Sequence, residues 1–500
     1  MVTTPADQPC RCARRGAAWA VALLALPLAL TSCAVYRPHK SAPPPVDLPD
    51  SFSEASEIDA VLAQAQPSPD RWWEAFGDDK LDELILRGLS DNFSLRVAWA
   101  RLDAAIALAR IAGAARWPQV GVDVGVGRDS RVVALGGGRT RLRTDTRSVT
   151  PGASYEVDLW GKLRFGTAAA RLEARAGRHD LDAAAMTLAA NVADVYFAII
   201  EQHARIDLIN QQSEVNQTYL DLTKLRFGQG QDSALDVDQQ RQQAASASAE
   251  LPLVKSRLKV LEHQLAVLLG QTPDTDLGVA GTVLPDLPPA PEAGIPAELL
   301  KRRPDVRAAE LRAVAADHRV AAAIADRFPT LRLGASLPFQ AAHFSQVFAD
   351  FVWSISAGLS APIIDGGVRR AEVDRTRAVA AERINNYGAV LLAALREVED
   401  ALVQERRQLA YLERVDEQVK IAHDTLREAR SSYVNGLGDY LPVLTALRAQ
   451  QQVELLQLRE KKRLLEHRIQ LYRALGGSWM SELEPADPAA KPVAEDAGEE

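Results

Sequence analysis

Cysteine, histidine and methionine are all scarce in this chain. Its three cysteines, Cys10, Cys12 and Cys33, all stand before residue 34, so disulfide bonds are excluded as the framework of the fold. The eight histidines are scattered, and no two of them have the spacing of a metal site. We therefore expect neither a metal nor a cofactor.

Sequence signatures of catalysis are missing as well. The glycine-rich run at 136–140 reads Gly-Gly-Gly-Arg-Thr and lacks the Lys-Ser/Thr pair of a phosphate-binding loop. The chain contains no nucleophile elbow. We predict that the protein is not an enzyme.

Charge of one sign is concentrated only at the C-terminus. The net charge is −8, and residues 481–500 hold seven acidic residues and one lysine. Residues 480–500 are therefore predicted to form a disordered acidic tail. The rest of the chain has no basic block, which argues against nucleic acid as a partner.

The N-terminus has the pattern of an exported protein. Arg11, Arg14 and Arg15 precede an apolar run at 17–30 that is too short to span a bilayer comfortably but suits a signal peptide. The run ends in Leu30-Thr31-Ser32-Cys33, which resembles a bacterial lipobox. We predict a lipoprotein signal peptide at 1–32, lipidation of Cys33 and an extended Pro/Ser-rich tether at 33–70. The alternative is a plain signal peptide with an incidental cysteine.

Matching landmarks recur along the chain. Gly230 and Gly436 lie 206 positions apart (436 − 230), as do Gly270 and Gly476 (476 − 270), and Arg-aromatic-Pro triplets start at 116 and 327. A period this long indicates duplication of a half-domain rather than a solenoid. We place the first repeat at 71–271, a Pro-rich connector at 272–297 and the second repeat at 298–479.

Long helices are predicted in both repeats. Apolar residues at spacings of three and four mark helices from about 163 to 227 and from about 368 to 434. Each would measure roughly 100 Å. Glycine-containing turns follow both helices, at 228–233 and 435–439, and a second apolar seam begins after each turn. This pattern predicts two long antiparallel helical hairpins with tips at Gly230 and Gly436.

Four runs change from the helical period to strict alternation. They lie at 120–126, 153–159, 330–337 and 353–361, with apolar residues on one face and Gly, Ser or single charges on the other. A half-buried soluble sheet could have this pattern, but the length and the two faces also suit strands of a membrane barrel. Four strands cannot close a barrel, whereas three chains would supply twelve. The Gly/Arg-rich stretch 128–148 is predicted to be a loop.

Three motifs resemble one known family. Residues 71–84, beginning Arg-Trp-Trp, 155–164 (Tyr-Glu-Val-Asp-Leu-Trp-Gly-Lys-Leu-Arg) and 300–310, around Arg302-Arg303-Pro304-Asp305, look like hallmarks of the TolC-like outer-membrane efflux channels, lipoprotein branch. The resemblance covers about residues 71–479. It implies an α+β membrane protein: a homotrimer with a twelve-stranded barrel in outer-membrane lipid and a helical tunnel through the periplasm. It also implies a periplasmic adaptor and an inner-membrane pump of the resistance-nodulation-division type as partners.

The resemblance also implies sites at the hairpin tips. Gln229, Gly230, Asn435 and Gly436 would be seats for the adaptor, although the two glycines could equally be ordinary turn residues. Near the second tip the family commonly has Leu-Leu-Asp-Ala-Gln, where this chain has Val-Leu-Thr-Ala-Leu at 443–447. Candidate residues for a periplasmic gate are Asp236, Asp238, Asp439, Leu441, Thr445 and Arg448. The acidic ones could also be simple solvated charges at helix ends.

The predicted function is passive export of small molecules delivered by the pump. Two alternatives stay open: the exit duct of a protein-secretion system, and a lipid-anchored coiled-coil scaffold that conducts nothing. The four alternating runs argue against the scaffold, because a scaffold needs no lipid-facing apolar rows.

Overall fold

The computed structural model describes residues 36–50, 52, 71–135, 138–291, 296–348, 352–477 and 479–483. The predicted signal peptide, Cys33 and residues 484–500 of the predicted acidic tail (480–500) lie outside these residues. The first residues of that tail were wrongly predicted to be disordered, since Trp479–Glu482 form a short 3-10 helix in which Met480 is buried. The chain divides into two compact units, and each unit takes segments from both repeats. Unit 1 contains Ala107–Leu172 and Arg312–Arg383 with the N-terminal segment to Ala42, and unit 2 contains the remainder.

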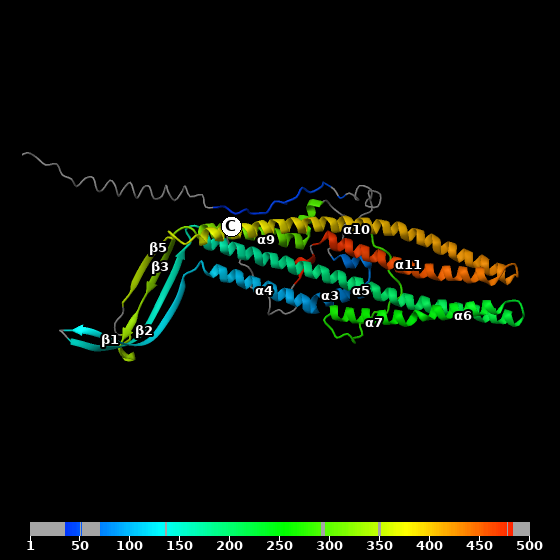
Figure 1. Ribbon diagram of the computed structural model, residues 1–500, viewed down its shortest axis with the longest axis horizontal. Coiled ribbons are helices and arrows are strands. Elements are labelled where there is room, and N and C mark those ends of the chain that lie inside the picture. Colours follow the sequence, from blue (N-terminus) through cyan, green and yellow to red (C-terminus); the bar gives the residue numbers. More distant parts are fainter. Residues whose placement is uncertain are drawn as a thin grey trace, which may run out of the picture. The chain divides into compact units, whose positions relative to one another are not determined.

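The sheet of unit 1 is antiparallel. Its strands are β1 (Gln119–Leu135), β2 (Gly138–Val157), β3 (Thr330–Ser336), the short β4 (Phe339–Ala341) and β5 (Ser354–Ser360), labelled in Figure 1. The order is β1-β2-β3-β5, and β4 pairs with β2 beside this path. All four predicted strand runs are therefore found, and the three-residue β4 is an addition that the sequence did not predict.

The prediction of a loop at 128–148 was wrong. Strands β1 and β2 pair without interruption from Gln119–Ser154 to Leu135–Gly138. The loop had been inferred from Gly and Arg composition, yet Arg139, Arg141 and Arg143 alternate with Thr and Leu at the strand period, and β-branched residues fill much of both strands. The arginines occupy one face of a hairpin.

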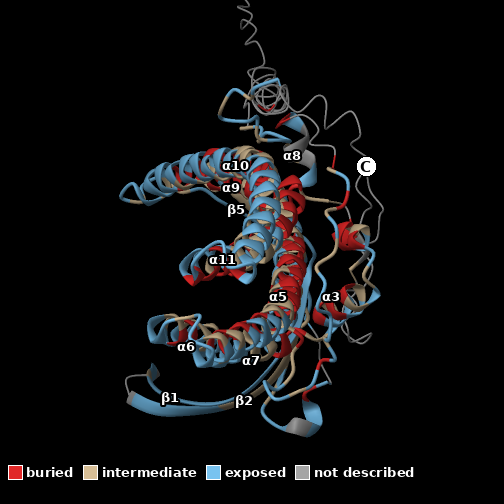
Figure 2. Ribbon diagram, turned by 90° about the vertical axis from the view of Figure 1, so that its right-hand side faces the viewer, coloured by how far each residue is buried: buried red, intermediate tan, exposed pale blue. Residues whose placement is uncertain are grey.

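The register sorts the sheet into two faces. Cross-strand partners share a face, so Val120, Val122, Val124 and Val126 lie with Ala153, Pro151, Val149 and Arg147. The same face continues through Leu331 and Leu333 to Leu359 and Ala357. The opposite face carries mainly Gly, Ser and Thr with a few charges, among them Glu156 paired with Arg332 at 3.3 Å. Figure 2 shows β1 largely exposed, and the four valines are each 61–78% exposed.

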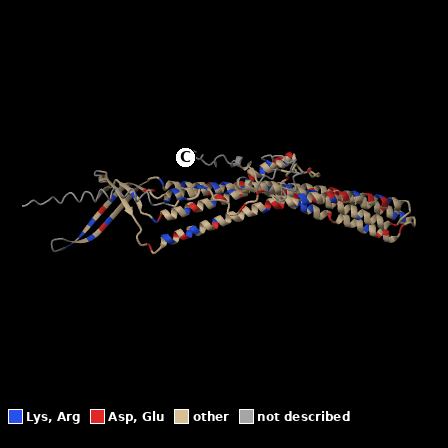
Figure 3. Ribbon diagram, turned by 90° about the horizontal axis from the view of Figure 1, so that it is seen from above, with Lys and Arg blue, Asp and Glu red and all other residues tan. Residues whose placement is uncertain are grey.

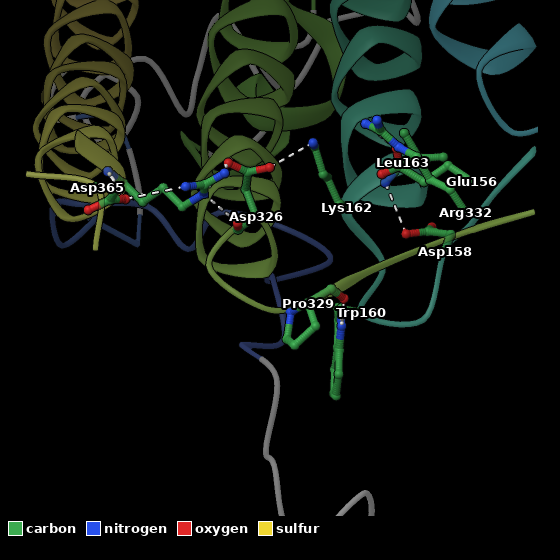
Figure 4. Close-up of polar contacts among 10 residues, drawn as sticks. Glu156, Asp158, Trp160, Lys162, Leu163, Asp326, Pro329, Arg332 and Asp365 are labelled. Atoms are coloured by element: carbon green, nitrogen blue, oxygen red, sulfur yellow. Dashed lines mark hydrogen bonds and ion pairs between the residues drawn. The ribbon is translucent and has the colours of Figure 1, made fainter. Parts of the chain in front are cut away.

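Polar contacts fix the points where strands meet helices in unit 1 (Figure 4). The Asp158 carboxylate accepts hydrogen bonds from the backbone N–H of Leu163 (3.1 Å) and Arg164 (2.8 Å), which satisfies the open end of α5. The indole of Trp160 donates to the carbonyl of Pro329 at 2.7 Å, and Lys162 pairs with Asp326 at 2.7 Å. The motif at 155–164 therefore builds a structural junction.

Two very long helices run through the chain. Helix α5 (Lys162–Gly228) and helix α10 (Val368–Val434) each contain 67 residues, within one residue of the predicted limits. Within the described residues, α5 is the one helix long and apolar enough to cross a bilayer, but 67% of its apolar stretch is buried, as in the core helix of a folded protein.

Shorter helices complete both repeats. In the first repeat, α3 (Asp79–Asp91) and α4 (Phe93–Ala114) precede the strands, and α6 (Ala234–Ala249) and α7 (Leu251–Leu268) follow α5. In the second repeat, α8 (Leu299–Arg302) and α9 (Pro304–Ala325) precede the strands, and the unbroken α11 (Tyr440–Leu475) follows α10. The return helix is divided only in the first repeat, where Pro252 stands in the first turn of α7.

The core of unit 2 is built on the motif at 71–84. Trp72 stacks on Tyr472, with ring centroids 5.4 Å apart, and Trp73 meets Trp479 edge-to-face at 4.8 Å. Helix α3 adds Leu81, Leu84 and Ile85, which are fully buried, and the Asp78 side chain caps its first turn. The motif therefore joins the first repeat to the end of the second.

Each repeat contains the same helix break in unit 2. Asn92, between α3 and α4, donates its amide to the carbonyl of Leu268 (2.9 Å), and Arg303, between α8 and α9, donates to the carbonyl of Ala474 (3.1 Å). Two residues after each acceptor stands a glycine with positive φ. A Cβ added to Gly270 would lie 2.4 Å from the carbonyl oxygen of Asp91, and one added to Gly476 would lie 2.7 Å from that of Arg302.

Candidate functional site at the hairpin tips

Both predicted tips are tight turns that end a long helix. At the first, Gly230 N–H donates to Phe227 and Gln231 N–H donates to Arg226, both at 2.9 Å. At the second, Gly436 N–H donates to Tyr433 (3.1 Å) and Leu437 N–H to Ser432 (2.8 Å). These pairs of bonds define a Schellman motif, so the two tips are built in the same way.

The two tip glycines meet a conformational need but no crowding. Gly230 has φ +75° and Gly436 has φ +71°, in the left-handed region that side chains disfavour. A Cβ at either position would meet no atom of this chain within 4 Å. The space beside each tip is therefore open to the backbone of another molecule.

The other two predicted docking residues are also exposed. Gln229 and Asn435 each precede a tip glycine. The Asn435 amide donates to the carbonyl of Ser431 at 2.9 Å, which closes the last turn of α10. All four predicted docking residues thus lie at the exposed ends of the two hairpins.

A polar link that the sequence did not reveal joins the two hairpins. The Tyr433 hydroxyl, at the end of α10, donates to the Asp232 carboxylate, just after the first tip. Arg226 pairs with the same carboxylate at 3.2 Å, and its guanidinium lies 4.3 Å from the centre of the Tyr433 ring. The Asp232 side chain is only 3% exposed. Burial and the bond to Asp232 raise the pKa of Tyr433, so its hydroxyl stays protonated and remains a donor.

A second contact lies next to this link. The Tyr440 hydroxyl donates to the side-chain carbonyl of Gln240 at 2.6 Å, and the Tyr433 and Tyr440 ring centroids are 5.3 Å apart. Burial also raises the pKa of Tyr440. Both tyrosines belong to an apolar cluster with Val443, Leu444, Leu447 and Tyr219. The tips are therefore held by packing as well as by hydrogen bonds.

A layer of buried amides continues the connection along the hairpins. Asn216 and Gln243 donate to the Gln451 side-chain oxygen at 3.2 and 3.0 Å, and Gln240 donates to the Asn216 carbonyl at 2.8 Å. Asn216 and Gln240 are fully buried. Amides buried in a helical core fix which residues face one another, since any shift leaves them unpaired.

The predicted gate residues do not gather into one cluster within the chain. Asp236 caps α6 in a reciprocal capping box with Ser233, and Asp238 pairs with Arg241 at 2.8 Å. Asp439 stands at the N-cap of α11 and its side chain caps no N–H. Leu441 is 55% exposed, the Thr445 hydroxyl donates to the Leu441 carbonyl (2.9 Å), and Arg448 donates to Gln243 (2.7 Å).

Removing the Tyr433 hydroxyl should loosen the tips. We expect Tyr433→Phe to lower the local opening free energy by about 1.5–3 kcal/mol, the usual worth of a hydrogen bond to a charged group. Hydrogen exchange of the amides around 226–240 and 429–444 would report the change. Tyr411→Phe is the matched control, because Tyr411 is on the same helix and is 46% exposed. Equal protection in the two variants would contradict a role for the link.

No group of three or more His, Cys, Asp or Glu is arranged to hold a metal ion among the residues that the structure describes. Cys33, the predicted lipidation site, lies outside them. The geometry is that of two linked helical hairpins with exposed, equivalent tips, and of a sheet with one apolar face.

Comparisons with known proteins agree on one family. The family model described as outer membrane efflux protein matches residues 84–271 and 295–477. The chain is 33% identical over 476 residues to the pyoverdine export outer membrane protein OpmQ of Pseudomonas putida, covering 92% of this chain and 97% of that protein. It is 26% identical to the probable outer membrane lipoprotein SilC of Salmonella typhimurium, covering 90% and 97%. The solved structure of the outer-membrane channel OprN matches this chain with a TM-score of 0.82 and 27% sequence identity. The match covers 89% of this chain and 100% of the OprN chain.

Proposed function

The chain belongs to the outer membrane efflux protein family and is the outer-membrane channel of an efflux system, and we propose that three copies assemble to form it. Each copy would contribute β1, β2, β3 and β5 to a twelve-stranded barrel in the outer membrane. The helical hairpins would form the periplasmic tunnel. Small molecules would reach it from an inner-membrane pump of the resistance-nodulation-division type through a periplasmic adaptor.

The open sheet with its apolar face is the observation that carries this proposal. In the order β1-β2-β3-β5, the outer edges of β1 and β5 pair with no strand among the residues that the structure describes. Unpaired backbone groups are too costly inside a bilayer, so such a sheet must close on other copies. The apolar face runs from Val157 to Val149 along β2, which is about 27 Å of strand. At a strand tilt of about 40° this spans roughly 21 Å along the membrane normal, which is close to the apolar band of about 25 Å on a membrane barrel.

Arginine substitutions on the two faces test the barrel. We expect Ile355→Arg, level with Ala153 in the middle of the apolar band, to impair assembly of the trimer by about 2–4 kcal/mol. Val124→Arg, level with Val149 at the end of the band, should impair it less, by about 0–1 kcal/mol. Ser356→Arg, on the opposite face next to Gly334, should assemble normally. The measurement is the amount of heat-resistant trimer in purified outer membranes. Equal amounts for all three variants would refute the assignment of faces.

Lipidation of Cys33 would add a second attachment to the membrane. Each buried CH₂ group of an acyl chain contributes about 0.8 kcal/mol to membrane binding, so several chains anchor a protein far more firmly than one. The likeness to the probable outer membrane lipoprotein SilC supports this part of the proposal. The barrel would still hold a chain that lacks the lipid.

The tips are proposed as the docking sites of the adaptor. A trimer would present six similar tips, two from each copy, and six similar seats favour a partner of six-fold arrangement. The open space beside Gly230 and Gly436 supports close approach of another backbone. Each of the three copies would then place one set of the candidate gate residues, from Asp236 to Arg448, around the periplasmic opening. The link between Asp232 and Tyr433 would limit how far this opening can widen.

Gly436→Asp tests the docking. We expect it to abolish efflux-dependent resistance, because it adds a charged side chain at the seat and strains a backbone with φ +71°. Gly230→Asp should act in the same way but more weakly, since the first tip lacks counterparts of Gly438 and Tyr440. Crosslinking of the adaptor to a cysteine placed at Asn435 measures docking directly. If the Gly436→Asp variant assembles as a trimer and shows normal resistance and crosslinking, the tip is not a docking site for the adaptor.

A further inference from the structure

The distal half of the β1–β2 hairpin has an unequal distribution of charge between its faces. Beyond Val124 and Val149, the apolar face continues through five arginines and one acid, whereas the opposite face carries Asp129 and Arg131. The arginines of this face are Arg128, Arg139, Arg141, Arg143 and Arg147. Figure 3 shows the blue positions along these strands. A face that is apolar near the helices thus becomes basic toward the hairpin end.

The arginines of this face differ in their side-chain contacts. Arg128 is held by Asp145 through two bonds of 2.6 and 2.8 Å, and Arg147 donates to the carbonyl of Ala342. Arg139, Arg141 and Arg143 are exposed, and their side chains make no hydrogen bond or ion pair with any other residue that the structure describes. Standing two residues apart on one strand, they form a row with a spacing of about 7 Å. We call these three residues the arginine row.

The height of the row constrains what it can meet. Arg143 and Arg139 lie 6 and 10 residues beyond Val149, the last apolar residue of β2 on this face, or about 20 and 34 Å along the strand. A tilt of about 40° still leaves them roughly 15–26 Å above the apolar band. The polar layer of an ordinary phospholipid leaflet is only about 5–8 Å thick. The row therefore stands above phospholipid headgroups.

We propose that the arginine row binds the phosphate groups of a membrane glycolipid whose phosphorylated sugars project well beyond its acyl chains. Guanidinium groups match phosphate oxygens in two-bond geometry, and the row faces the lipid rather than the channel. An anionic headgroup of this height would supply the counter-charges that the protein itself does not. This inference rests on the proposed placement of the sheet in the outer membrane.

Matched substitutions on the two faces of the hairpin provide the test. Arg141 is paired with Val132, while Arg131 is paired with Leu142 one position away on the opposite face, so Arg141→Gln and Arg131→Gln remove the same charge at nearly the same height. The full chain, purified in detergent, would be titrated with lipopolysaccharide and, separately, with phosphatidylglycerol. We expect Arg141→Gln to weaken lipopolysaccharide binding about fivefold and the triple Gln variant of the row about 100-fold. Arg131→Gln should bind as the parent does.

Phosphatidylglycerol binding should be the same for the parent and the triple variant. The inference is overturned if the triple variant binds lipopolysaccharide like the parent, or if Arg131→Gln weakens it as much as Arg141→Gln. An equal loss of phosphatidylglycerol binding would overturn the assignment to a tall headgroup. Trimer formation and conductance in planar bilayers are measured on the same samples. If the parent chain neither assembles nor conducts, the proposed barrel fails; if it does both and the row has no effect, only this inference fails.

Discussion

Replacing Gly476 or Gly270 with alanine will lower the free energy of unfolding by about 2–5 kcal/mol. Both glycines have positive φ, +77° at Gly476 and +70° at Gly270. A side chain with positive φ costs about 1–3 kcal/mol, most at Gly476, whose ψ of −159° is essentially restricted to glycine. In addition, the new Cβ would lie 2.7 or 2.4 Å from a backbone carbonyl oxygen. The contacted backbone at Arg302 or Asp91 cannot move aside as a flexible side chain can. The two segments that meet at the helix break would therefore have to move apart.

Gly230→Ala separates the two causes. Gly230 has nearly the same φ, but its added Cβ meets nothing within 4 Å, so only the conformational cost of about 1–2 kcal/mol remains. Midpoints of thermal unfolding in detergent would be compared for the three variants, because a large assembly does not unfold in two states. If Gly270→Ala and Gly230→Ala shift the midpoint equally, the close approach to Asp91 contributes nothing.

Arg303→Met will have the second large effect, a loss of about 3 kcal/mol. The Arg303 side chain is 5% exposed and pairs with Asp305 at 2.6 Å and Glu397 at 2.8 Å. It also donates to the carbonyl of Ala474. Methionine fills similar volume but leaves these acceptors without their donor. Breaking a buried ion pair usually costs about 3–5 kcal/mol. We expect the lower value here, because both carboxylates are 36% exposed and water can reach them.

Arg302→Met is the control for this substitution. Arg302 is the neighbouring residue and is exposed, so its replacement should change stability by less than about 0.5 kcal/mol. Adding Glu397→Gln to Arg303→Met should recover part of the loss, which a double-mutant cycle of unfolding midpoints would measure. Absence of any recovery would show that the pair with Glu397 does not contribute.

Periodicity predicted the long elements well. Apolar residues repeat so regularly along α5 and α10 that their ends were predicted to within one residue, since a helix of this length must keep one seam in register. Alternation likewise found β1, β2, β3 and β5. The prediction failed at 128–148, where arginine was taken as a sign of a loop although Arg139, Arg141 and Arg143 stand at alternate positions.

Contacts between distant residues were not predictable in this way. Asp232 and Tyr433 are 201 positions apart, and the local sequence around either residue does not predict a contact with the other. The amide layer was missed because glutamines on a helix ordinarily face water. The duplication offered one usable signal, since Phe227 and Tyr433 occupy matching places before the tip glycines and the hydroxyl is the difference between them.

The repeated helix break bears on how the chain arose. Gly270 approaches Asp91 within the first repeat, and Gly476 approaches Arg302 within the second, so each repeat contains both sides of its own contact. The donor beside the contact has changed from an amide at Asn92 to a guanidinium at Arg303, while the glycine is the same in both. Divergence after the predicted duplication would have been free to exchange a side chain that only has to reach a carbonyl. It would not have been free to replace the glycine, because the path of the backbone there leaves no room for a side chain.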